Sequence, residues 1–438
     1  MTRKTTFVTL ITLSMLTLAI LLSGSCGGDG DHKATEQKSQ ARSVIILAID
    51  GLRADALGSY GGAASTPALD ALAGESVRFD QAWAQAPGMQ ASLASLLTGL
   101  YPTTHGLVES GDHLVPEANT LAESLSTAGL TTAAFVQGAK GGGSFGLEQG
   151  FSQYTVGPKP GLAGLSWLGE HAGEDVFLVV AGWSAGRLES SDANSTPPPE
   201  GFAQRLQQAL TSETPDSLND EDLTYARAAY SAHVTRIDAA IGEFIEKLRS
   251  SGRLDTSTLV FVGTSGFALS EHGDLINNSL YPAVTRVPLM IRMPGTPAKT
   301  IDTVVEVLDL MPTMIEVAGA INPDGLQGSS LMPIISGTSN PPYIAFSESD
   351  MAGGMRSVAM NGMQLVTFGD QGSLFDLNAD PMAMTDLAEE FPERATVLSE
   401  HLGAWSKMVS ASSLDPERKT EDLDDDTLDQ LRSLGYIQ

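Results

Sequence analysis

The chain has 438 residues, of which 42% are hydrophobic, enough to bury the core of one large domain with a smaller one attached. Its formal net charge of −28 excludes general affinity for nucleic acid and for anionic membrane surfaces unless a local basic patch intervenes. Cys26 is the single cysteine, so no intramolecular disulfide forms and cysteine usage does not reveal the redox compartment.

The N-terminus has the organisation of an export signal. Residues 1–25 place Arg3 and Lys4 before an apolar stretch, which predicts a signal peptide rather than a spanning helix. Small residues before Cys26 resemble a bacterial lipoprotein cleavage site, in which the cysteine is lipidated; the alternative is an ordinary signal peptide with an incidental cysteine. We expect an exported lipoprotein of the cell envelope with the membrane as partner, and a disordered tether over residues 26–42.

The folded part alternates strands and helices. Residues 44–49 form an apolar run rich in β-branched residues, which predicts a buried parallel strand ending at Asp50. Ligands of open α/β sheets bind beyond such strand ends, so Asp50 is a candidate site residue. Further strands are expected at 131–136, 175–182, 258–262 and 288–293, and helices at 66–75, 94–102, 120–128, 220–250 and 304–318. This alternation predicts a mainly parallel sheet covered by helices on both faces.

Three stretches resemble the sulfatase family of the alkaline-phosphatase superfamily: residues 49–58 (IDGLRADALG), 66–73 (TPALDALA) and 95–102 (SLLTGLYP). The resemblance covers residues 43–405. It implies an α/β sulfatase-like domain over residues 43–339 and a small C-terminal α+β subdomain over 340–413. Residues 414–438 are rich in Asp and Glu and are expected to form an acidic tail.

Ester hydrolysis in this superfamily needs a nucleophile, divalent metal and cationic groups that stabilise the developing charge. The resemblance places the nucleophile at Met89 and the arginine of the same motif at Leu93, while Ser92 keeps the motif serine. Methionine is a thioether with no proton to lose and no route to formylglycine. No catalytic residue is therefore assigned to this motif.

The metal ligands are depleted in the same way. Asp50 matches the first metal aspartate of the family, and Gly51 stands where many relatives have a second. Thr264 and Ser265 occupy the positions of a later aspartate and histidine, and Phe267 that of a glutamate. Neutral hydroxyls are poor sole ligands for a divalent ion, which prefers anionic oxygen.

Four residues are expected to line the remaining cleft: Arg53, Met89, Ser92 and His272. Two alternatives stay open. Asp50 is either a residual metal ligand or a carboxylate that caps a turn or pairs with Arg53, and His272 either lines the cleft or has a structural role.

The apolar replacements at Met89, Leu93 and Phe267 either form an apolar pocket together or merely pack against one another.

The leading interpretation is a pseudoenzyme: an exported sulfatase-like lipoprotein without cofactor that acts as a binding or scaffold module. An active paralogue or another envelope protein is a possible partner, and no nucleic acid is expected. The rival is a sulfuric- or phosphoric-ester hydrolase rebuilt around Asp50, with a single divalent cation such as Ca²⁺ and ligands from Asp55, Asp274 or Glu348.

Overall fold

A computed structural model describes residues 42–418 apart from 110, 139–142, 187, 189–196, 212–217, 274, 276–278, 339–343 and 351–353. The predicted signal peptide, Cys26 and residues 26–41 of the tether lie outside the described residues, as do Asp274 and the tail from residue 419. None of the described helices is both long and apolar enough to cross a bilayer.

A central sheet of eight strands organises the molecule, in the order β4-β3-β5-β1-β6-β7-β2-β8. The strand bounds are β1 Ser43–Ile49, β2 Val77–Trp83, β3 Thr131–Gln137, β4 Gln153–Gly157, β5 Val176–Gly182, β6 Ser257–Gly263, β7 Arg286–Arg292 and β8 Lys299–Glu306. Strand β1 pairs in parallel with both β5 and β6, whereas β7 runs antiparallel to its neighbours β6 and β2. The predicted mainly parallel sheet is confirmed.

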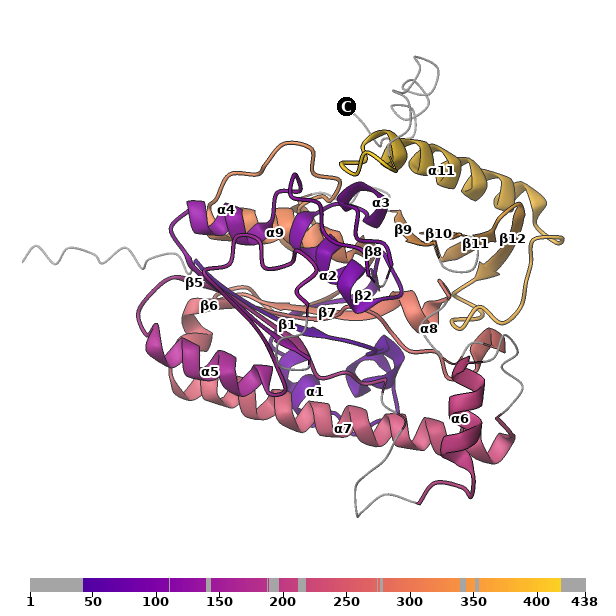
Figure 1. Cartoon of the computed structure of the whole chain (residues 1–438), viewed down its shortest axis with the longest axis horizontal. Coiled ribbons are helices and arrows are strands. Elements are labelled where there is room, and N and C mark those ends of the chain that lie inside the picture. The colour runs from indigo at the N-terminus through magenta and orange to yellow at the C-terminus, as the bar shows by residue number, and fades with distance from the viewer. Residues whose placement is uncertain are drawn as a thin grey trace, which may run out of the picture. The chain divides into compact units, whose positions relative to one another are not determined.

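Helices cover both faces of this sheet. Figure 1 shows α1, α5 and α7 on one face and α2, α4 and α9 on the other. The bounds are α1 Pro67–Ala73, α2 Met89–Thr98, α3 Pro102–His105, α4 Leu121–Thr127, α5 Pro160–Glu170, α6 Phe202–Thr211, α7 Asp220–Ser250, α8 Pro282–Thr285, α9 Leu310–Ala318, α10 Met332–Ser336 and α11 Pro392–Ala411. The longest, α7, has the predicted bounds and begins with a capping box between Asn219 and Asp222.

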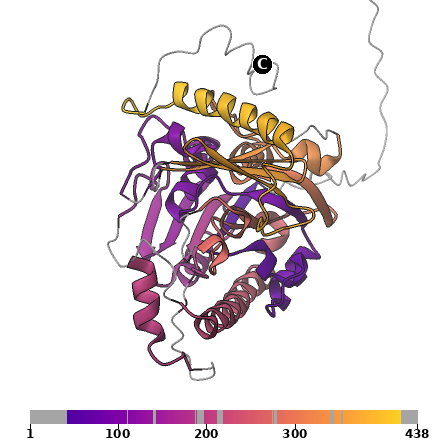
Figure 2. The same ribbon diagram turned by 90° about the vertical axis from the view of Figure 1, so that its right-hand side faces the viewer.

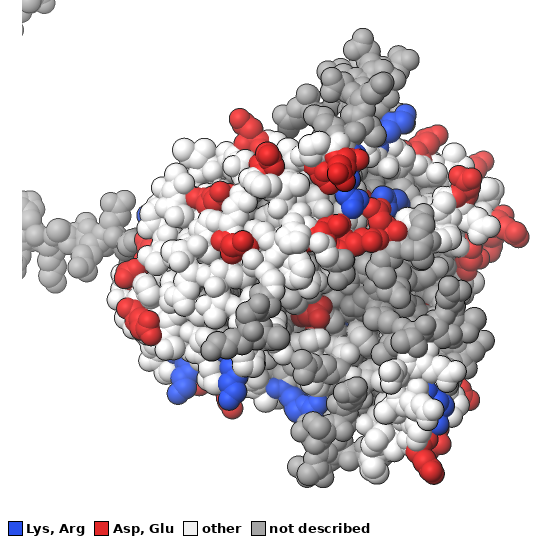
Figure 3. All heavy atoms as spheres, viewed as in Figure 1, with Lys and Arg blue, Asp and Glu red and all other residues white. Residues whose placement is uncertain are grey.

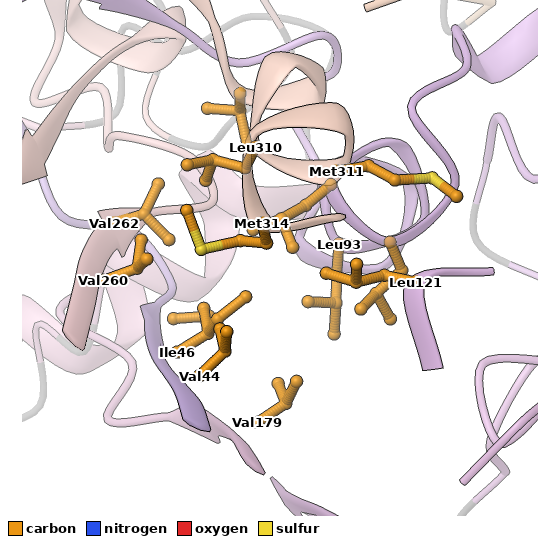
Figure 4. Close-up of a cluster of buried hydrophobic side chains, with 14 of the residues drawn as sticks. Val44, Ile46, Leu93, Leu121, Val179, Val260, Val262, Leu310, Met311 and Met314 are labelled. Atoms are coloured by element: carbon orange, nitrogen blue, oxygen red, sulfur yellow. The ribbon is translucent and has the colours of Figure 1, made fainter. Parts of the chain in front are cut away.

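The core lies on both sides of β1 because every residue of this strand is buried. Val44 and Ile46 point into a cluster completed by Leu93 of α2 and Met314 of α9 (Figure 4). The intervening residues of β1 point to the opposite face, where they pack in a cluster with apolar residues of α7.

A second, antiparallel sheet has the order β12-β11-β10-β9. Its strands are β9 Ala345–Ser349, β10 Met355–Met360, β11 Met363–Phe368 and β12 Gln371–Asp376. Helix α11 packs across it (Figures 1 and 2). The expected small C-terminal α+β part is therefore present, within the same compact unit as the large sheet.

The helix predicted for residues 304–318 is wrong in its first part. Val304 and Val305 belong to β8 and pair with Gln81 and Ala82 of β2, and α9 begins only at Leu310. β-Branched residues favour strands, and here the partner strand, distant in sequence, decides the outcome.

Candidate functional site

Three adjacent strand ends meet at Asp50, which directly follows β1. Ser184 follows β5 and donates a hydrogen bond to Asp50 Oδ2 at 3.2 Å, and Ser265 follows β6 and donates to Oδ1 at 3.1 Å. Backbone hydrogen bonds also join these strand ends: Ala185 N donates to Asp50 O at 2.8 Å, and Thr264 N donates to Ile49 O at 2.9 Å. Parallel pairing of β5, β1 and β6 brings these three side chains together.

Burial raises the pKa of the Asp50 carboxyl, although the hydrogen bonds from Ser265 and Ser184 act to lower it. Both partners are neutral hydroxyls. The alternative that Asp50 pairs with Arg53 is wrong, because the Arg53 guanidinium bonds to Asp55 and Glu271 instead.

A cavity of about 430 Å³ opens between Asp50 and the start of α2. Met89 is the first residue of this helix, after Gly88, and no side chain caps the helix N-terminus. Met89 and Asp50 both line the cavity, and Glu109 adds a second acidic group. The described lining residues include no Lys, Arg or His, so the partial positive charge of the helix end has no cationic side chain beside it.

On the other side of Asp50 the space is filled by packed groups. Gly51 has φ +67°, and a Cβ there would lie 2.9 Å from Gly186 N. A Cβ on Gly186 would in turn lie 2.5 Å from Cδ2 of Phe267, so the Phe267 ring rests on this backbone. That ring stacks on Tyr230 at 5.9 Å between centroids, and the Tyr230 hydroxyl donates to Gly51 O at 2.9 Å.

These residues do not fit the divalent metal that the family resemblance implies. The Thr264 hydroxyl lies 3.4 Å from Ile49 O, and the Ser265 hydroxyl is bonded to Asp50. Across the described ranges, no group of three His, Cys, Asp or Glu side chains is placed to hold a metal ion. Asp50 itself has two hydroxyls as side-chain partners, and Glu109 of the same cavity completes no group of three such ligands among the described residues, so the anionic oxygens that Ca²⁺ or Mg²⁺ prefers are too few.

Two of the three carboxylates considered for a rebuilt site, Asp55 and Glu348, are engaged elsewhere, and the third, Asp274, lies outside the described residues. Asp55 binds the Arg53 guanidinium at 2.8 Å. Glu348 is buried and accepts hydrogen bonds from Thr103 N at 2.7 Å and Thr103 Oγ1 at 2.6 Å. Neither therefore serves as a ligand partner of Asp50.

Arg53 is a buried structural cation rather than a cavity residue, contrary to expectation. Its side chain bonds to Asp55, to Glu271 at 2.7 Å and to Phe267 O at 3.3 Å. Burial acts to lower the pKa of Arg53, but the hydrogen bond and charge of Asp55 and the charge of Glu271 raise it above its usual value. For Glu271, burial acts to raise the pKa, but the charge of Arg53 and its hydrogen bond outweigh burial, so the pKa of Glu271 is lower than usual.

Ser92 and His272 also lie away from the cavity. The Ser92 hydroxyl donates to Ala86 O at 2.8 Å, which ties α2 to the preceding loop. His272 stacks on Tyr281 with ring centroids 3.5 Å apart and meets Phe375 of β12 edge-on, which favours its structural alternative. Of the four residues expected to line the cleft, the structure brings only Met89 to the cavity beside Asp50.

The three apolar replacements do not come together as one set. Met89 and Leu93 belong to the cluster beneath α2, whereas Phe267 belongs to the cluster on the opposite face of the sheet. The sequence reasoning missed Ser184 and Tyr230. A signal existed for Ser184, since it comes two residues after a predicted buried strand; none identified Tyr230 among the buried positions of α7.

Comparison with known proteins agrees with this fold. A family model described as Sulfatase matches residues 42–158 and 149–320, and one described as N-sulphoglucosamine sulphohydrolase, C-terminal, matches residues 270–405. Arylsulfatase of Clostridium perfringens is 25% identical over 444 residues, covering 81% of this chain and 92% of that protein. Arylsulfatase K of Xenopus laevis is 32% identical over 202 residues, but the match covers 42% of this chain and only 38% of the relative.

Solved structures share the fold at low identity. Phosphonate monoester hydrolase of Agrobacterium radiobacter aligns with a TM-score of 0.67 at 20% identity, covering 84% of this chain and 96% of that one. A structure solved in complex with its substrate D-glucosamine-2-N,6-O-disulfate aligns with a TM-score of 0.71 at 18% identity, covering 87% and 100%.

Proposed function

Because the chain belongs to the sulfatase family, we propose that it keeps the family fold without its ester-hydrolase chemistry and acts as a binding or scaffold module. We further propose that it is exported and anchored to a membrane of the cell envelope by a lipid on Cys26. An active paralogue or another envelope protein is its proposed partner. Fold alone does not carry these proposals, since one fold hosts many functions.

The observation that carries the proposal is the composition of the site around Asp50. Met89 stands at the helix start that the family motif assigns to the nucleophile, and a thioether cannot attack sulfur or phosphorus as a deprotonated nucleophile would. Phe267 fills the space beside Gly51. The described residues around Asp50 thus offer neither the family's nucleophile nor enough ligands for a metal ion, and hydrolysis in this family requires both.

A second candidate is a hydrolase with a rebuilt site. Two observations favour it: the cavity beside Asp50 is open at an uncapped helix N-terminus, and the Clostridium perfringens relative that matches most of both chains is an arylsulfatase. This function would need a water nucleophile and a cation held partly by groups other than Asp55 and Glu348.

Hydrolysis assays separate the two candidates. The purified protein is offered aryl sulfates, phosphate monoesters and phosphate diesters with Ca²⁺, Mn²⁺ and Zn²⁺ in turn, beside Asp50→Asn. The matched control is Asp302→Asn, which changes an exposed aspartate of β8 at the far edge of the sheet. We expect no turnover. Turnover that Asp50→Asn abolishes and Asp302→Asn preserves would overturn the proposal.

The membrane anchor is tested separately. We expect the native protein to fractionate with membranes and its N-terminal peptide to carry a lipid mass on Cys26, while Cys26→Ala releases the protein in soluble form. Fractionation unchanged by Cys26→Ala would refute the lipid anchor. Pull-down from the native membrane then identifies any partner.

A further inference from the structure

A second cavity, which we call the Trp183 groove, opens beside the Asp50 cavity between α5 and α7. Its volume is about 400 Å³, and Gln137 and Ser184 line both cavities. Trp183, Leu162 and Phe244 supply its apolar surface. Leu162 is 64% exposed.

The Trp183 ring is held in place from several directions. The backbone of Trp183 has φ +55°, a strained value for an aromatic residue, and the backbone N–H of Trp183 donates to Gln137 Oε1 at 2.6 Å. Phe244 packs edge-on against the ring with centroids 6.4 Å apart. A Cβ on Gly161 would lie 2.5 Å from Cζ2 of Trp183, so the absence of a side chain there lets the half-buried ring rest on α5. The result is a fixed aromatic surface inside a cavity.

Basic groups surround this surface. Lys159 precedes α5 and stands at its N-cap, where no side chain caps the helix. A cation at a helix N-terminus is disfavoured by the helix dipole, so Lys159 is not there to stabilise α5. Arg236 also lines the groove and its Nη2 donates to His233 Nδ1 at 2.7 Å, while Glu243 is the one acidic residue among the described lining residues.

This local excess of positive charge stands out in a chain whose net charge is −28. Acidic side chains are scattered over the face that Figure 3 shows. A long polyanion would be repelled by such a surface, whereas a small anion would feel mainly the groups that touch it, because other charges are screened beyond about 8–10 Å.

We propose that the Trp183 groove binds a small organic anion that carries a flat ring. The ring packs on Trp183, and the anionic group is bound by Lys159 and by the backbone N–H groups of Gly161 and Leu162 at the start of α5, where Pro160 has no N–H to offer. Ser184, whose hydroxyl is bonded to Asp50, lies between the Trp183 groove and the Asp50 carboxyl. This proposal does not depend on whether the Asp50 cavity hydrolyses anything.

Two fluorescent probes with the same rings test the charge requirement on the purified full chain: anilinonaphthalene sulfonate and the neutral N-phenylnaphthylamine. We expect the sulfonate to bind more tightly than the neutral probe. Lys159→Gln should weaken sulfonate binding about three- to tenfold and leave neutral binding unchanged. The matched control Lys407→Gln changes an exposed lysine of α11, outside the groove, and should change neither.

The ring requirement is tested at Trp183. Trp183→Leu should weaken both probes, and Gly161→Ala, which displaces the ring, should do the same without changing Trp183 itself. Benzoate, an anion with a flat ring, should displace the sulfonate, whereas glucuronate, an anion with a puckered ring, should not. Equal affinity for both probes, or sulfonate binding insensitive to Lys159→Gln, would overturn the proposal.

Discussion

Phe267→Ala tests whether the space beside Gly51 is filled by packing. The Phe267 ring is 7% exposed, stacks on Tyr230 at an interplanar angle of 12° and rests on the Gly186 backbone. That backbone cannot collapse into the vacated volume easily, because Ala185 N is bonded to Asp50 O at 2.8 Å. We therefore expect Phe267→Ala to lower the free energy of unfolding by about 3–5 kcal/mol.

The measurement is urea unfolding followed by circular dichroism, with Phe368→Ala as the matched control. Phe368 is 46% exposed at the end of β11, so its truncation should cost less than about 1 kcal/mol. If Phe267→Ala costs as little as Phe368→Ala, the ring is not part of the packed core. The space beside Gly51 would then be available to a ligand or an ion, and the structural argument against catalysis would lose its main support.

Three further outcomes are expected. Gly51→Asp places a carboxylate where many relatives have one, but the residue has φ +67° and its Cβ would lie 2.9 Å from Gly186 N. We expect this change to lower the free energy of unfolding by about 2 kcal/mol or more, measured in urea. Added Ca²⁺ should not stabilise the variant in the same assay. Arg53→Met leaves Glu271 as a largely buried charge without its cation and should cost about 3–5 kcal/mol, part of which a second change, Glu271→Gln, restores in the same assay. Burial raises the pKa of Asp309 to about 7, above its unfolded value of about 3.9. Between these two values the native state holds more protons than the unfolded state, so the free energy of unfolding falls as pH rises. Unfolding measured at several pH values should show a smaller fall for Asp309→Asn.

The position of Asp50 could be predicted from the sequence because the signal is local. An apolar β-branched run that stops at an aspartate specifies a buried strand and a polar side chain at its end. The same reasoning, applied to the runs before Ser184 and Ser265, would have predicted their meeting with Asp50 had the strand order been known. The order β5-β1-β6 is a property of the whole sheet, however, and no single segment encodes it.

The sequence could not predict which large side chain packs on which glycine when the two residues are far apart along the chain. Phe267 and Gly186 are separated by 80 positions along the chain, yet the ring of one occupies the space that a side chain on the other would need. Arg53 was expected in the cleft because its motif is intact. Burial beside Asp55 and Glu271 decides its role instead, and neither partner is recognisable from spacing alone.

The changes around Asp50 are physically linked. A buried carboxylate without a cation is costly, and here burial raises the pKa of Asp50, whose side chain is bonded to the neutral hydroxyls of Ser184 and Ser265. Phe267 occupies the space beside Gly51 and Gly186, next to this carboxyl, and adds apolar burial there. Phe267 then requires Gly186 to stay without a side chain, and Gly186 leaves no room for a carboxylate at Gly51. A carboxylate at Gly51 would therefore destabilise the fold unless Gly186 and Phe267 also moved, so under the proposed function recovery of hydrolysis would require several substitutions together.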